Sequence, residues 1–243
     1  MLKLVKMNIY YSLKTKILWV LYLITILLIV VLYGMTDVEA SEFILQTMID
    51  MIKGEDALII LAIFTISLAG SKYKTGYIKN IGNHYKRYKF FLADFITTGL
   101  FSISLFLLIL LVNILCVVVS QVPIAGSDIL CLVPYLAVQV IQHIAVGAVI
   151  LFMVNVIENT TICMAISMSY ICIFSILIWN VIDKIVQKIN INISVLDYVV
   201  TMNIYSIPGG FAEKLYMRML TQAMALMLVF GVLNILYMRK KDL

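Results

Sequence analysis

The sequence predicts an all-α integral membrane protein with six transmembrane helices and an N-terminal amphipathic helix at the membrane surface. Hydrophobic residues make up 63% of the 243 residues and charged residues only 13%, whereas soluble domains average about 45–50% and 25%. The mean hydropathy is +1.07. Because six crossings of about 20 residues use roughly 120 residues, the connections are too short for a second domain of ordinary size. Residues 1–243 are therefore predicted to form a single transmembrane domain.

The first predicted element is an interfacial helix over residues 1–16. Lys3, Lys6, Tyr10 and Lys14 fall within one arc of a helical wheel, which suits a helix in the inner headgroup layer. The alternative is an ordinary basic flank to the first span. The apolar run that follows is longer than the hydrophobic region of a usual signal peptide, and no cleavage pattern follows it closely. We therefore expect a retained helix.

Six apolar runs predict the six spans. They cover residues 17–33, 57–70, 98–120, 131–157, 161–182 and 219–238. The second run is short and becomes a full span only when residues 54–73 are used, with the charged ends reaching into the headgroups. It is kept because without it the basic segment 72–89 would share a side with the acidic segment 37–56.

The charge distribution predicts a cell-membrane protein with both termini in the cytoplasm. In that topology thirteen of the eighteen basic residues lie inside and ten of the thirteen acidic residues lie outside. Lysine and arginine are enriched in the cytoplasmic loops of membrane proteins. The net charge of +5 is then explained by topology, and nucleic-acid binding is set aside.

Two connections are long enough to have a role of their own. Residues 71–90 hold six basic residues, four tyrosines and no acid, a mixture that favours a protein-docking surface. The alternative is a loop whose tyrosines lie in the headgroup belt. Residues 183–218, between the fifth and sixth spans, contain apolar clusters and a Pro-Gly-Gly break at 208–210. We expect re-entrant or interfacial helices there, on the extracellular side.

No catalytic, cofactor or metal site is expected in this chain. It has no phosphate-binding GxxxxGK loop, no HExxH motif and no GxSxG motif, and only two histidines. An intramembrane hydrolase is therefore poorly supported. The four cysteines lie in or at the ends of spans and are interpreted as buried small hydrophobes, with a disulfide between Cys116 and Cys131 left open.

Polar residues within the spans are the candidates for a cargo path. Gln139, Gln142 and His143 share one helix face at spacings of three and four residues. The other candidates are Asn155, Trp179 and Asn180. For any one of them, hydrogen bonding between helices is the alternative role. Asp94 is expected to be stabilised by free backbone N–H groups and by Arg87, which is favoured over a proton relay.

With these features the chain resembles the membrane subunits of ABC-2 type exporters. The resemblance comes from the basic amphipathic start, the six spans, the long outer loop, and residues 72–82 (KYKTGYIKNIG) followed by Arg87 and residues 90–95 (FFLADF). It extends over the whole chain as a layout. The small size is similar to that of Gram-positive phenol-soluble modulin exporters and lantibiotic-immunity permeases.

The resemblance implies a coupling helix that docks on a separate ATPase subunit. By position it falls on Tyr73, Tyr77, Ile78, Lys79, Asn80 and Ile81. It also implies two membrane subunits, identical or different, beside an ATPase dimer that binds ATP and Mg. The expected function is export of an amphipathic peptide. The alternatives are a lantibiotic or small-antibiotic resistance permease, and a membrane scaffold or sensor subunit that transports nothing.

Overall fold

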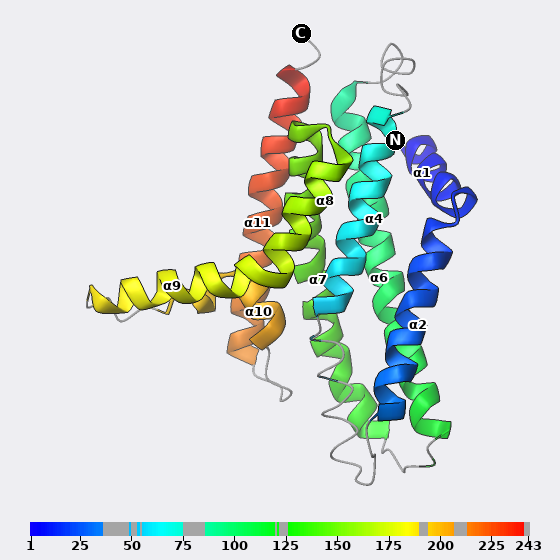
Figure 1. Cartoon of the computed structure of the whole chain (residues 1–243), viewed down its shortest axis with the longest axis vertical. Helices are drawn as coiled ribbons and strands as arrows, with labels where there is room; N and C mark the ends of the chain where they lie inside the picture. The colour runs from blue at the N-terminus through cyan, green and yellow to red at the C-terminus, as the bar shows by residue number, and fades with distance from the viewer. Residues whose placement is uncertain are drawn as a thin grey trace.

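The computed structural model describes residues 1–35, 49, 53, 55–74, 86–119, 121, 126–189, 194–206 and 213–240. The regular elements within these ranges are all helical (Figure 1). They are α1 (Leu2–Lys14), α2 (Ile17–Met35), α4 (Glu55–Lys74), α6 (Arg87–Val119), α7 (Gly126–Ile157), α8 (Thr160–Ser169), the π-helical turn η1 (Tyr170–Phe174), α9 (Ser175–Lys188), the 3₁₀ turn η2 (Leu196–Tyr198), α10 (Val200–Ser206) and α11 (Glu213–Lys240).

Among the described residues, five stretches are long and apolar enough to cross a membrane. They are Ile17–Gly34, Arg87–Val119, Leu132–Ile157, Thr160–Lys188 and Lys214–Lys240. Each overlaps a predicted span, because length and hydropathy are local properties of the sequence. The chain is therefore an all-α protein with the helices of a multi-pass membrane protein.

The predicted second span is α4, which lies inside the bundle. It packs against α7, α8 and α6, and its Leu58, Leu61 and Ala62 are fully buried. A helix that is apolar on all sides is usually enclosed by protein. Its 20 residues form one continuous helix, with Glu55 and Asp56 at its start and Lys72 and Lys74 at its end.

The predicted fifth span bends where the sequence suggested one straight helix. α8 runs along the bundle, the chain then passes through η1, and α9 extends sideways away from the other helices (Figure 1). A π-helical turn changes the direction of a helix and is a recognised cause of sharp kinks. Within 183–218 the chain forms the end of α9, η2, α10 and the start of α11. The break at 208–210 lies outside the described residues.

Contacts bring α1, the start of α6 and the end of α11 to one end of the bundle (Figure 1). The Arg239 guanidinium lies 5.5 Å from the ring centroid of Tyr88. At the same end, Glu158 takes a left-handed backbone conformation with φ of 56°, and Asn159 caps α8 by accepting hydrogen bonds from two backbone N–H groups. This end is called the α1 end below.

Candidate functional site

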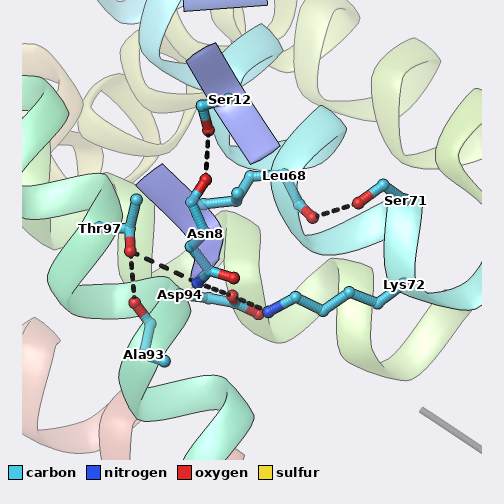
Figure 2. Close-up of polar contacts among 8 residues, drawn as sticks. All are labelled: Asn8, Ser12, Leu68, Ser71, Lys72, Ala93, Asp94 and Thr97. Carbon is cyan, nitrogen blue, oxygen red and sulfur yellow. Dashed lines mark hydrogen bonds and ion pairs between the residues drawn. The ribbon is translucent and has the colours of Figure 1, made fainter. Parts of the chain in front are cut away.

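A buried polar cluster at the α1 end joins three helices (Figure 2). It consists of Asn8 on α1, Lys72 on α4, and Asp94 and Thr97 on α6, and is called the junction below. Lys72 Nζ forms an ion pair and hydrogen bond with Asp94 Oδ1. Asn8 Nδ2 donates to the same oxygen at 2.8 Å and to Thr97 Oγ1 at 3.4 Å. All four side chains are buried.

Local packing explains why these four side chains meet. Leu4 and Val5 of α1 form a small apolar cluster with Phe90 and Ala93 of α6. Leu4 lies one helical turn before Asn8, and Phe90 lies one turn before Asp94. That contact presses the buried face of α1 onto α6 and brings the Asn8 amide to the carboxylate. Phe90 also lies beneath Lys72, whose ammonium group is 5.7 Å from the ring centroid.

The partner of Asp94 differs from the sequence prediction. We expected Arg87, which precedes Asp94 on the same helix, whereas the structure places Lys72 of α4 and Asn8 of α1 against the carboxylate. Both partners come from other helices. α4 packs against α6, which brings Lys72 to Asp94 although the two residues are far apart in sequence.

The junction is a functional candidate because a gain in stability does not account for the presence of a buried ion pair. Desolvating two charges offsets much of their attraction, so a buried ion pair is weak evidence for stability. Charged side chains inside membrane helices are rare and usually mark function. Lys72 stands near the end of α4, close before the segment 75–85.

The predicted polar face of α7 is enclosed by protein. Gln139, Gln142 and His143 are fully buried. Gln139 Nε2 donates to the backbone oxygen of Ile204 at 3.0 Å, which ties α7 to α10. His143 Nδ1 lies 2.8 Å from the backbone oxygen of Gln139, and its ring meets the ring of Phe106 edge-on at 4.8 Å between centroids. These three side chains are therefore packed inside the chain.

The other three path candidates lie elsewhere. Asn155 Nδ2 on α7 donates to Asn234 Oδ1 on α11 at 2.8 Å, and both are buried. Trp179 Nε1 donates to the hydroxyl of Tyr170 at 3.0 Å. Asn180 donates to the backbone oxygen of Ile176 within α9. The structure thus does not bring the six candidates together at one place.

An apolar cavity of about 670 Å³ lies among α7, α8, η1, α9, η2, α10 and α11. Trp179 is the one path candidate that lines it. Apolar side chains form most of its wall, including Ile150, Leu226 and Phe230. Its polar lining comprises Ser167, Tyr170, Trp179, Tyr198, Thr201 and Gln222. This volume is within the range of small-molecule sites, about 300–1,000 Å³.

The coupling residues implied by the resemblance are mostly outside the described part of the chain. Tyr73 belongs to the last turn of α4, and its side chain is not described; Tyr77, Ile78, Lys79, Asn80 and Ile81 all fall between the described ranges. Over the described ranges, no group of three or more His, Cys, Asp or Glu residues is placed to hold a metal ion.

Sequence reasoning missed Asn8 and the cavity. A signal for Asn8 was present: it lies four residues after Leu4 and four before Ser12, on the face of α1 opposite the lysines. All three of these residues are buried. The cavity had no such signal, because its wall comes from elements distant in sequence.

The chain matches no protein-family model, and no curated protein matches its sequence. The functional assignment therefore depends on the geometry of the junction and on the layout of the helices.

Proposed function

We propose that this chain is the membrane subunit of an ABC-2 type exporter, driven by a separate ATPase subunit. In this proposal the bundle crosses the cell membrane six times, with α4 as the second crossing, and the α1 end faces the cytoplasm. The observation that carries the proposal is the junction: a buried ion pair that links the end of α4 to α1 and α6, adjacent to the segment expected to contact the ATPase.

The junction suits the transmission of movement for a specific reason. Asp94 accepts from both Lys72 and Asn8 through one carboxylate oxygen, so displacing α4 strains the contact to α1 as well. Separating the pair would leave a buried charge without its partner, which costs several kcal/mol. We infer that α1, α4 and the start of α6 move together when the ATPase shifts the segment 75–85.

Coupling of this kind requires two states of the bundle that differ in the free energy of their contact with the ATPase. If the ATPase docked equally well on both states of the bundle, its binding would shift no equilibrium. The proposal therefore assigns to ATP binding a docked state that favours one arrangement of the three helices. ATP and Mg belong to the ATPase dimer, and this chain holds the cargo path together with a second membrane subunit.

The proposed cargo is an amphipathic peptide taken from the membrane. Its apolar face would be held by apolar side chains, as for peptides that lie in the headgroup layer. Trp179 and Asn180 on α9 are the path candidates that the exterior can reach. Gln139, Gln142, His143 and Asn155 are enclosed within the chain, so a direct role for them would need the bundle to open.

The test is peptide transport by the native complex. The tagged chain is purified with its associated subunits from its own host and inserted into vesicles, and ATP-dependent uptake of a fluorescent amphipathic peptide is measured. The matched control carries an inactivated ATPase. Uptake that needs ATP and is lost in the control supports the proposal. Absence of an associated ATPase, or ATP hydrolysis that never responds to peptide, would instead indicate a scaffold or sensor.

A further inference from the structure

The apolar cavity opens to the exterior at the level of the membrane-spanning helices. Its lining residues Ile166 on α8 and Val229 on α11 are exposed on the outside of the bundle, and both belong to stretches apolar enough to cross a membrane. With these helices in a bilayer, the medium at this opening is hydrocarbon. An apolar cavity in contact with hydrocarbon is filled by hydrocarbon rather than by water.

The volume and lining of the cavity suit one acyl chain. The volume of about 670 Å³ is within the range of small-molecule sites. No charged side chain is among its lining residues, which also suits a hydrocarbon ligand.

The polar groups of the cavity include donors that the protein leaves unused. Ser167 lines the cavity, and its hydroxyl is buried with no hydrogen-bond partner among the described residues. The other polar groups lie toward α9 and α10, where Trp179, Tyr170 and Thr201 are linked by hydrogen bonds. Trp and Tyr are typical of the zone where lipid chains meet headgroups.

A cation lies next to this polar side. Arg218 precedes the lining residue Gln222 by one turn of α11, and its guanidinium lies 5.8 Å from the ring centroid of Tyr198, which also lines the cavity. Arg218 Nη1 contacts the exposed carboxylate of Asp197 at 3.4 Å. The Arg218 side chain is 34% exposed, so its guanidinium can be reached by an anion at the surface.

We propose that the cavity binds one acyl chain of a membrane phospholipid, with Arg218 donating to its phosphate. This inference depends on the membrane-spanning helices and not on the exporter assignment. The acyl chain lies against Ile150, Leu226 and Phe230, and the ester region of the lipid lies toward Gln222 and Trp179. The phosphate competes with Asp197 for the guanidinium of Arg218.

The test uses phosphatidylglycerol with a photoreactive diazirine near the end of one acyl chain. The full chain, purified with its associated subunits, is placed in vesicles containing this lipid and irradiated, and the labelled peptides are identified by mass spectrometry. We expect labelling to concentrate on residues 166–171 and 222–230. Equal labelling of all exposed apolar faces would overturn the proposal.

Two valines on α11 give matched variants. Val229 lines the cavity and is 54% exposed, whereas Val232 does not line it and is 53% exposed. Val229→Trp should lower labelling in the cavity about tenfold or more, because the indole ring fills the space that the acyl chain would occupy. Val232→Trp should leave it unchanged. Ala225→Phe, which also fills the cavity, replaces Val229→Trp if that variant fails to insert. Undiminished labelling in the filled cavity would contradict the proposal.

Competition separates phospholipid from other ligands. Arg218→Gln should reduce phospholipid labelling about threefold to tenfold, because a charge-assisted hydrogen bond is lost at a partly exposed site. Unlabelled phosphatidylglycerol should displace the probe. A free fatty acid that displaces it more effectively would overturn the phospholipid assignment, and displacement by an amphipathic peptide would identify the cavity as a cargo site instead.

Discussion

Lys72 of α4 and Asp94 of α6 form an ion pair whose side chains are only 7% and 4% exposed. Asn8 of α1 donates to the same carboxylate oxygen as Lys72. Three helices that are distant in sequence are thereby joined through a single oxygen atom. Because water is excluded, the effect of a substitution depends on whether it removes one charge or both.

Removing one charge of the pair should destabilise the protein more than removing both. Asp94→Leu leaves the Lys72 charge buried, and we expect a loss of about 3–5 kcal/mol in stability. The double variant Lys72→Met with Asp94→Leu should recover most of that loss, because no buried charge remains. Thermal unfolding of the purified protein measures both. If Asp94→Leu alone is as stable as the original chain, the pair is not buried as described.

A methyl group added at Gly70 should disturb the contact between α4 and α8. The new Cβ would lie 2.0 Å from Cγ2 of Thr160, so Gly70→Ala should cost about 1–3 kcal/mol through overpacking. Thr160→Ala removes that methyl group and should restore stability in the double variant. At Gly231 of α11 nothing lies within 4 Å, so Gly231→Ala is the matched control and should not destabilise the protein. Equal effects at both positions would contradict the packing.

Asn155 and Asn234 should be energetically coupled. Their side chains share a hydrogen bond of 2.8 Å between α7 and α11, and such bonds within membrane bundles contribute about 0.6–2 kcal/mol. A double-mutant cycle with Asn155→Leu and Asn234→Leu should give a coupling energy in that range. Additive losses would mean that the two amides do not contact each other.

Asn8 should hold α1 against α6. In Asn8→Leu the hydrogen bond to Asp94 is lost, so α1 should detach more often and expose its buried face. A cysteine placed at Val5, which is 7% exposed, should then react with a water-soluble maleimide about fivefold faster or more. A cysteine at Leu2, 78% exposed, is the control and should react equally in both backgrounds. An unchanged rate at Val5 would show that Asn8 does not anchor the helix.

The predictable part of the fold was the part determined by local sequence. Each long apolar helix matches a run of apolar residues, and the lysines predicted to lie on one side of α1 are exposed. The bend at Tyr170–Phe174 was not predictable, since these five residues are hydrophobic and include neither proline nor glycine. Periodicity does not distinguish a straight helix from one with a π-helical turn.

The candidate site depended on contacts between distant elements, and the sequence predicted it less well. Arg87 was the cation predicted to stabilise Asp94, yet Lys72, 22 residues away, is the partner. Gln139, Gln142 and His143 share a helix face as expected, but their enclosure follows from how α10 and α6 pack against α7. Helix faces can be read from spacing, whereas the neighbour that covers each face cannot.

The most direct test of the central claim measures transport and ATP hydrolysis in the same vesicles. In the native complex, Asp94→Asn keeps the shape of the junction while weakening its link to Lys72 and Asn8. The account predicts that ATP hydrolysis stays within about twofold of the original complex while peptide uptake falls about tenfold or more, since a weakened buried charge pair costs over 1.4 kcal/mol. Unchanged uptake per ATP hydrolysed would contradict it.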